Sequence, residues 1–197
     1  MSVLPALSGL GVDAPPPHGK GTGTLYLVAP LLVAGGKNLG PAVLLVKESR
    51  HHNTWGPPGG ETDKTDHSPL HAALREFNEE VSRDWRNVAN VCKGFRLVCV
   101  HQSQDKAHES WCMIADVPVA QVENALFGED RSNHTLGRRM NTTLRKGETG
   151  GYAWVPLAVL KDTAQDKRDW FKLGQYTCKL RDKRRTNRAI LRIVTLL

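Results

Sequence analysis

Residues 68–81 read Ser-Pro-Leu-His-Ala-Ala-Leu-Arg-Glu-Phe-Asn-Glu-Glu-Val, and this stretch decides the fold of the chain. Ser68 suits the N-cap of a helix, and Pro69 suits its first position. Four apolar residues follow at intervals of four, three and four, namely Leu70, Leu74, Phe77 and Val81. This spacing places them on one helix face. The stretch therefore predicts an amphipathic helix that begins at Ser68 and buries one apolar stripe.

The same helix carries three glutamates opposite its apolar stripe. Glu76, Glu79 and Glu80 stand at i, i+3 and i+4, so they share one face. Three carboxylates that converge on one point repel one another unless a cation neutralises them. Oxygen ligands favour a hard ion such as Mg²⁺ or Mn²⁺, and such ions commonly act on phosphates. A solvated acidic helix face is the alternative interpretation of this pattern.

Segments on both sides of this helix have the composition of β-strands. The predicted strands cover residues 23–34, 42–47, 94–101, 110–117 and 152–156, and further helices are predicted over 119–126 and 186–197. The first two strands are expected to form a hairpin. Residues 127–150 are basic and predict a loop. The order strand, strand, helix, strand, strand is compatible with one α/β domain.

Gly59-Gly60, a polar loop and Ala72–Val81 together resemble the signature of the Nudix hydrolases, G-x5-E-x7-R-E-U-x-E-E-x-G-U with U apolar. Trp154–Leu157 and the flanking strands are also similar to that family. The resemblance implies an α/β fold, a Nudix-type α/β/α sandwich around a mixed β-sheet, in a single domain over residues 22–197. Residues 1–21 are rich in proline and glycine, and we expect them to form a flexible N-terminal lead.

The chain departs from this signature at three positions. Counted from Gly60, the loop holds one extra residue before Arg75. The first glutamate of the signature is missing, and either Asp66 or His67 takes its place, depending on where the gap is set. Ser82 stands where the signature has its last glycine. Because the arginine and the three glutamates keep their mutual spacing, the departures concern the loop rather than the metal ligands.

The resemblance implies a metal site. Divalent ions, Mg²⁺ or Mn²⁺, would be bound by Glu76, Glu79, Glu80 and the backbone carbonyl of Gly59. Arg75 would orient one of the glutamates by charge-assisted hydrogen bonds. A surface ion pair between Arg75 and Glu79 is the alternative. Among these residues, Arg75, Glu76 and Glu79 are the predicted catalytic ones.

A carboxylate must also take a proton from the attacking water. In this family the base is not fixed, and it is either a glutamate of the signature or an acid from a distant loop. Glu148 is our candidate for a loop acid, and Glu129 is the second; an ordinary surface role is the alternative for each. The implied reaction is divalent-metal-dependent hydrolysis of a diphosphate linkage in a nucleoside diphosphate linked to another moiety.

A competing class is a non-catalytic nucleotide- or RNA-binding module on a Nudix fold. The intact glutamates argue against it, because a pure binding module has no chemical need for all three. Dinucleotide polyphosphates, nucleotide sugars and capped RNA all fit the signature, because the signature holds only the metals and the diphosphate. The substrate therefore stays open within the class of phosphorylated small molecules and nucleotides.

The net charge of +7 lies in the last part of the chain. Residues 1–160 contain 16 basic and 16 acidic residues, whereas residues 161–197 contain 11 and 4. We expect residues 161–197 to form a basic C-terminal helix. The run Lys179–Arg185 is either a solvated face or a surface that attracts RNA or another polyanion.

The sequence also bears on the cellular location of the protein. Its longest apolar stretch, residues 25–34, is broken by Pro30 and is about half as long as a membrane-spanning helix. The N-terminus lacks the charged start of a signal peptide. We therefore expect no membrane partner and a cytoplasmic location, with the nucleus as the alternative.

Overall fold

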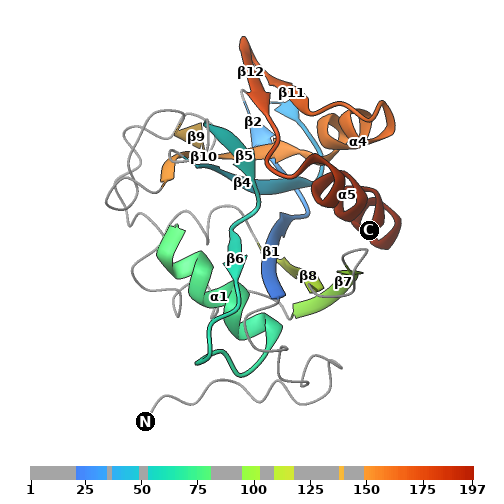
Figure 1. Ribbon diagram of the computed structural model, residues 1–197. Helices are drawn as coiled ribbons and strands as arrows, with labels where there is room; N and C mark the ends of the chain where they lie inside the picture. Colours follow the sequence, from blue (N-terminus) through green and yellow to red (C-terminus); the bar gives the residue numbers. More distant parts are fainter. Residues whose placement is uncertain are drawn as a thin grey trace.

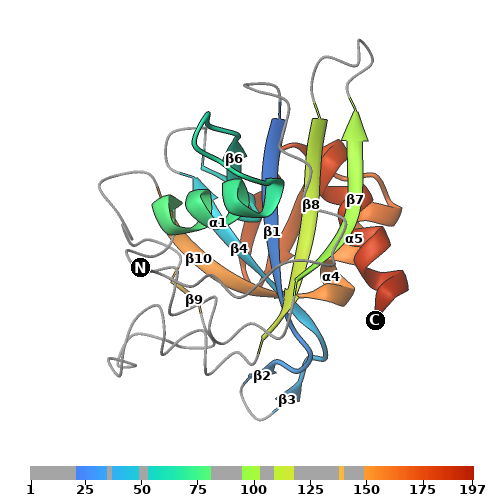
Figure 2. The same cartoon turned by 90° about the horizontal axis from the view of Figure 1, so that it is seen from below.

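The computed structural model describes residues 21–34, 37–48, 53–80, 95–102, 109–117, 138–139 and 149–197. These ranges form one mixed sheet with helices on both faces (Figures 1 and 2). The strands of the sheet are β1 (Gly21–Ala29), β4 (Ala42–Glu48), β5 (Thr54–Gly56), β6 (Gly59–Glu61), β7 (Phe95–Gln102), β8 (Glu109–Asp116), β9 (Arg138–Arg139) and β10 (Thr149–Pro156). The helices are α1 (Pro69–Glu80), α4 (Leu157–Gln165) and α5 (Lys183–Leu196). None of the helices in these ranges is long and apolar enough to cross a membrane.

Strand β1 is the centre of the sheet. The strand order is β7-β8-β1-β4-β10-β9, with β5 paired to β4 and β6 paired to β1. The pairing of β1 with β8 is parallel, and the other pairings are antiparallel. Two short hairpins lie outside the sheet, one of β2 (Val33–Ala34) with β3 (Lys37–Asn38) and one of β11 (Trp170–Leu173) with β12 (Tyr176–Lys179). The predicted mixed sheet is thus confirmed.

The two faces of the sheet build two separate cores. Along β1, Leu25 and Leu27 pack into the core that contains α1, whereas Tyr26 and Val28 pack into the core that contains α4 and α5. This alternation follows from the two-residue period of a strand. Helix α1 therefore covers one face, and α4 and α5 cover the other (Figure 1), which is the predicted α/β/α sandwich.

The sheet opens where the chain passes from β5 to β6. Strand β1 pairs with β4 only at Val28 and Ala29, and its other end, Thr22–Thr24, pairs with β6. Strand β4 meanwhile pairs with β5 over Val46–Glu48. The turn between β5 and β6 is thus held between two diverging strands. This opening positions the residues of the site.

The helix predicted from residues 68–81 is confirmed as α1. The Ser68 hydroxyl accepts a hydrogen bond from the backbone N–H of His71 at 3.1 Å, as an N-cap should. Leu70, Leu74 and Phe77 are buried against the sheet. The glutamates of α1 therefore lie on the side that faces away from the core.

Several predicted boundaries differ from the structure. The strand predicted over 23–34 ends at Ala29, because Pro30 has no N–H to donate to a ladder and Leu32 instead pairs with residues 39 and 40 at the base of the β2–β3 hairpin. The strands predicted over 94–101, 110–117 and 152–156 are β7, β8 and β10, shifted at their ends by one to three residues. Helix 119–126 and most of loop 127–150 lie outside the described residues, although β9 and the start of β10 fall within that loop.

The prediction of one basic helix over residues 161–197 is wrong, whereas the helix predicted over residues 186–197 is confirmed as α5. Residues 161–197 contain the end of α4, the β11–β12 hairpin and α5. Gly174 makes the hairpin turn with a φ of 60°, and the side chain of Asp182 accepts from the N–H of Arg185 to begin α5. The prediction followed the basic charge rather than these turn residues. The domain boundary at residue 22 stays a prediction, although Gly21 already belongs to β1.

Because α1 carries the glutamates, its packing can be tested directly. We expect Phe77→Ala to lower the free energy of unfolding by about 3–5 kcal/mol, since the fully buried ring leaves a cavity under the helix. Leu191→Ala, at an exposed position of α5, is the matched control and should change it by less than about 0.5 kcal/mol. Urea denaturation checks both values, and equal losses would contradict the assigned core.

Candidate active site

Two glycines of β6 allow close contacts, Gly59 with strand β1 and Gly60 with a side chain of α1. The backbone N–H of Gly59 donates to Glu80 Oε2 at 3.0 Å. A Cβ at Gly59 would overlap the backbone of Gly23, and a Cβ at Gly60 would overlap the carboxylate of Glu76. Only glycine leaves room for these contacts. Gly59 and Gly60, at the start of β6 directly after the turn, thus form the surface against which the side chains of Glu80 and Glu76 lie.

Arg75 connects the loop before α1 to the glutamates. Its Nε and Nη2 donate to Asp66 at 3.2 and 3.0 Å, and its Nη1 donates to Glu76 Oε1 at 2.7 Å. Its Nη2 also donates to the carbonyl of Glu61 at 2.6 Å, while Glu79 is 3.5 Å from Nη1. The guanidinium is therefore fixed on several sides and in turn fixes the Glu76 carboxylate.

The structure brings Asp66, and not His67, to Arg75. Asp66 is buried, accepts from the N–H of Asp63 at 2.7 Å, and lies 3.0 Å from His71 Nδ1. Burial acts to raise the pKa of Asp66, but the hydrogen bonds from Arg75 and Asp63 outweigh it and hold the pKa below its ordinary value. The side chain of His67 is exposed. Asp66 therefore supplies the carboxylate beside the arginine that the signature's first glutamate would supply.

A second arginine reaches the site from the far end of the chain. Arg181 Nη1 donates to Glu80 Oε1 at 3.0 Å and to Glu48 Oε2 at 3.1 Å, and Nη2 donates to the carbonyl of Pro57. Its backbone N–H donates to the carbonyl of Trp55 at 2.7 Å. Arg181 thus joins the end of β4, the end of α1 and the turn between β5 and β6.

Burial has the largest effect on the pKa values of the two glutamates in this cluster. It raises the pKa of Glu80 above its ordinary value, although Arg181 and the Gly59 N–H act to lower it. Burial likewise raises the pKa of Glu76 against the opposing effect of Arg75. Burial acts to lower the pKa of Arg181, but Glu80 and Glu48 outweigh it and hold it above its usual range. Both arginines therefore stay charged, and the two glutamates are poorly compensated anions.

The three glutamates of α1 do not converge on one point, contrary to the prediction. Glu76 turns to Arg75 and Glu80 turns to Arg181, while the side chain of Glu79 is 44% exposed. Across the described ranges, no three His, Cys, Asp or Glu side chains are gathered closely enough to hold an ion. Arg75 instead contacts Glu76 and, at 3.5 Å, Glu79, while Arg181 contacts Glu80, and these positive charges lower the mutual repulsion of the carboxylates. Their role as metal ligands stays a prediction.

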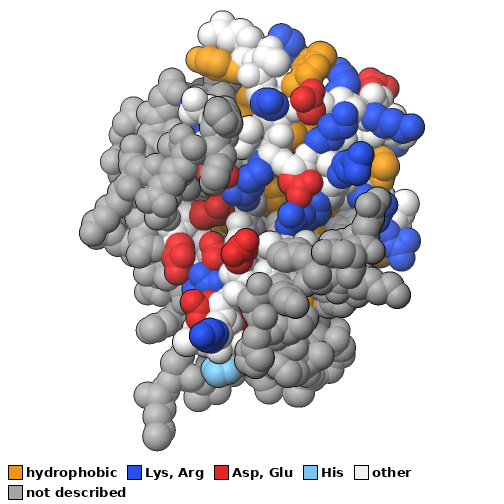
Figure 3. All heavy atoms as spheres, in the orientation of Figure 1, with side chains coloured by type: hydrophobic (Ala, Val, Ile, Leu, Met, Phe, Trp, Pro, Cys, Tyr) orange, Lys and Arg blue, Asp and Glu red, His pale blue; other side chains and the backbone are white. Residues whose placement is uncertain are grey.

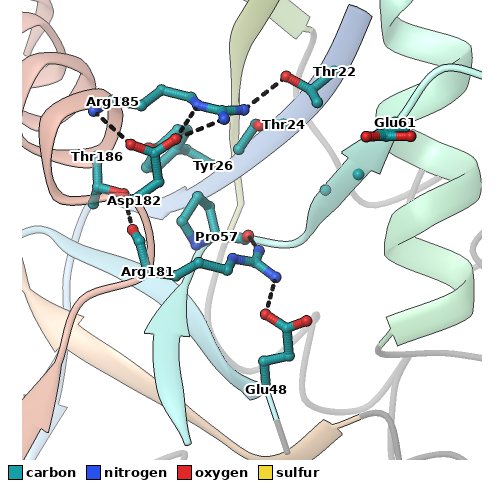
Figure 4. Close-up of a pocket in the computed structure, with 12 residues that line it drawn as sticks. Thr22, Thr24, Tyr26, Glu48, Pro57, Glu61, Arg181, Asp182, Arg185 and Thr186 are labelled. Carbon is teal, nitrogen blue, oxygen red and sulfur yellow. Dashed lines mark hydrogen bonds and ion pairs between the residues drawn. The ribbon is translucent and has the colours of Figure 1, made fainter. Parts of the chain in front are cut away.

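A cavity of about 490 Å³ lies beside Gly59 and Gly60 (Figure 4). Strand β1 contributes Thr22 and Thr24, β4 contributes Glu48, and the start of α5 contributes Arg185. Polar residues at alternate positions of β1 were a signal in the sequence for such a lining. No local pattern indicated that Glu48 or Arg185 belongs to it.

The basic run Lys179–Arg185 is divided between the cavity and the surface. Arg181 and Arg185 line the cavity, whereas Lys183 and Arg184 are exposed. Lys and Arg side chains gather over the C-terminal elements, and acidic side chains gather beside them (Figure 3). Arg181 therefore belongs neither to a solvated face nor to an outer binding surface. Glu148 and Glu129, the predicted loop acids, lie outside the described residues, as does Ser82.

Comparison with known proteins assigns the family. The family model described as NUDIX domain matches residues 27–174. The chain belongs to the Nudix family. Its fold is similar to a mutT/nudix family protein from Listeria innocua, with a TM-score of 0.53 and 16% identity over 91% of this chain and 96% of the other. The resemblance stated from the sequence is thus confirmed.

More distant Nudix structures are also similar. The NUDIX domain of NrtR from Shewanella oneidensis, solved with ADP ribose, has a TM-score of 0.49 and 17% identity over 90% of both chains. An Ap4A hydrolase from C. elegans has a TM-score of 0.46 and 15% identity over 90% of this chain and 96% of its own. No curated protein matches the chain.

The replacement of the Nudix signature's first glutamate by Asp66 has a measurable consequence. We expect Asp66→Asn to lower the free energy of unfolding near neutral pH by about 2 kcal/mol, because it removes the charge that Arg75 binds. The folded-state pKa is lowered, so this stabilisation is full above the ordinary value of 3.8 and is lost as pH falls through the folded value. Urea denaturation at a series of pH values measures it. His67→Ala should change little, and an equal effect of both substitutions would contradict the assignment.

Proposed function

We propose that this Nudix protein catalyses the divalent-metal-dependent hydrolysis of a diphosphate linkage in a nucleoside diphosphate linked to another moiety, with Mg²⁺ or Mn²⁺ as cofactor. One observation carries the proposal. Glu76 and Glu80 lie largely out of water against Gly59 and Gly60, beside a cavity, with one arginine on each. A diphosphate in that cavity would lie next to the carboxylates that family membership associates with metal binding.

The residues present fit a hard divalent ion. The donors are carboxylate oxygens and the carbonyl of Gly59, the ligand types that Mg²⁺ and Mn²⁺ prefer. Burial raises the pKa values of Glu76 and Glu80, so the pair gains from a further positive charge. Glu76, Glu79, Glu80 and the Gly59 carbonyl would hold the ions. When bound, such ions offset phosphate charge and lower the pKa of water.

The chain's own side chains then have distinct roles. Arg75 holds the Glu76 carboxylate in place through a 2.7 Å hydrogen bond. Arg181 positions Glu80 from the opposite side. Glu79 has one recorded contact, at 3.5 Å, and is the best placed described acid of α1 to accept a proton. Glu148 stays our proposal for an acid from the loop.

Substitution of the glutamates tests the site. We expect Glu79→Gln and Glu80→Gln each to keep the fold and to lower turnover on the order of a hundredfold or more, because each removes charge where phosphate charge must be offset. The measurement is product formation from a panel of diphosphate compounds with Mg²⁺. This panel also separates an enzyme from a binding module, since only an enzyme forms product.

A charge-matched control accompanies these variants. Asp166→Asn removes a carboxylate whose side chain is 63% exposed at the end of α4, so its turnover should equal that of the wild type. Thermal unfolding confirms that each variant is folded. Full activity in both glutamate variants would overturn the site, and failure of the wild type to hydrolyse any compound would overturn the reaction.

Metal binding should depend on pH in a defined direction. The raised pKa values of Glu76 and Glu80 mean that their contribution to metal-free stability is full below the ordinary value of 4.5 and is lost as pH rises through the raised values. Metal binding requires the ionised carboxylates. We therefore expect the increase in Tm caused by Mg²⁺ to be larger at about pH 8 than at about pH 5. Differential scanning fluorimetry measures it, and an increase independent of pH would contradict the assignment.

A further inference from the structure

The cavity has two ends of different chemistry. At one end, Glu48 shares the Arg181 guanidinium with Glu80 of α1, whereas Glu61 pairs with Thr22 across β6 and β1 and lies beside it (Figure 4). At the other end, Arg185, Thr22 and Thr24 lie together above the Arg181–Glu48 ion pair in the view of Figure 4. The glutamates of the proposed metal site adjoin the cavity at Gly59 and Gly60, which line it. The guanidinium and hydroxyl end has no role in the function proposed so far.

Arg185 is held in position and keeps donors to spare. Its Nε and Nη2 contact Asp182 Oδ2 at 2.8 and 2.6 Å, and its Nη1 donates to Thr22 Oγ1 at 2.7 Å. The Thr22 hydroxyl in turn donates to Ser110 at 2.8 Å. A guanidinium has five N–H groups, so two remain after these three contacts. The side chain is thus fixed before any ligand binds, and it can still donate.

Thr24 is a buried polar side chain with no partner in the described part of the chain. The residue is 6% exposed, lines the cavity, and has no recorded hydrogen bond from its hydroxyl. Thr22, two positions earlier on the same face of β1, uses its hydroxyl fully. A hydroxyl that faces a cavity without a protein partner can donate to water or to a ligand. The Thr24 hydroxyl is therefore free to donate to a ligand with oxygen acceptors.

The described lining offers no ring on which a nucleobase could stack. Tyr26 is the one aromatic residue among the described residues of the cavity, and it is fully buried. Base recognition commonly relies on exposed aromatic faces. Hydroxyls and a guanidinium instead suit a phosphate, which accepts several hydrogen bonds and carries negative charge.

We propose that Arg185, which Thr22 holds in place, and Thr24 bind a phosphate group that the substrate carries beyond the diphosphate that is hydrolysed. The substrate is then a compact diphosphate whose second half, such as a sugar or polyol, bears its own phosphate. This inference rests on the proposed hydrolysis, because that reaction fixes the diphosphate next to the glutamates of α1. Asp182 and Glu61 both oppose an anion nearby, so we expect the added phosphate to improve binding by no more than about tenfold.

A matched pair of probes tests this preference. ADP-ribose and ADP-ribose 1″-phosphate differ by one phosphate on the sugar half. The first readout is the ratio of their kcat/KM values with Mg²⁺. The second is the ratio of their Kd values by calorimetry in the Glu79→Gln background, which gives the preference independently of turnover. We expect both ratios to favour the phosphorylated compound, by no more than about tenfold.

Three substitutions identify the source of the preference. Arg185→Gln and Thr24→Val should each bring both ratios close to one, and Thr24→Val preserves side-chain shape in case Arg185→Gln lowers stability. Arg184→Gln is the matched control, because this exposed neighbour carries the same charge outside the cavity. Its ratios should equal those of the wild type.

The outcomes separate this inference from the proposed function. Ratios near one in the wild type, or ratios unchanged in Arg185→Gln and Thr24→Val, would overturn the phosphate subsite while hydrolysis itself stands. Loss of the preference in Arg184→Gln would assign it to the outer basic surface, as expected for RNA or another long polyanion, and would also overturn the subsite. A Kd preference that follows Arg185 and Thr24 without any hydrolysis would support the subsite and overturn the reaction.

Discussion

Two arginines hold four largely buried carboxylates around the turn between β5 and β6, and the geometry of the site depends on this balance. The four are Glu48, Asp66, Glu76 and Glu80. Arg75 serves two of them from within the Nudix signature, and Arg181 serves the other two from a distant segment. The four carboxylates and two guanidinium groups together carry a net charge of −2, and their side chains are largely buried. Ion pairs in such surroundings are costly to break, so the turn, α1 and the C-terminal segment are bound to one another.

The fold was predictable where several features of the local sequence indicate the same element. Helix α1 has an N-cap, a proline at its first position and a regular apolar stripe, and the structure reproduces it from Pro69 to Glu80. The C-terminal segment lacked such agreement, because its basic residues suggested one helix while Gly174 and Asp182 divide it. Strand β1 is buried on both faces, so its composition indicates a strand without indicating which side chains meet α1.

The site was predictable only as far as the Nudix signature extends. The signature identifies Arg75 and the glutamates, but their side-chain directions depend on partners that no local pattern names. Arg181 was counted in a basic run, although its Glu80 partner lies 101 positions away. The alternation of Thr22 and Thr24 was visible in the sequence. Its meaning requires knowing that α5 lies over that face of β1.

The link between Arg181 and Glu80 also orders events during synthesis of the chain. A ribosome makes Glu80 about one hundred residues before it makes the guanidinium partner of this side chain. Until then Glu80 and Glu48 lack their shared cation, and the cavity lacks the wall that begins at Arg181. Contacts this distant in sequence form late because closing so long a loop costs entropy. The candidate site is therefore among the last regions to reach its final arrangement, although the residues that define its family are made early.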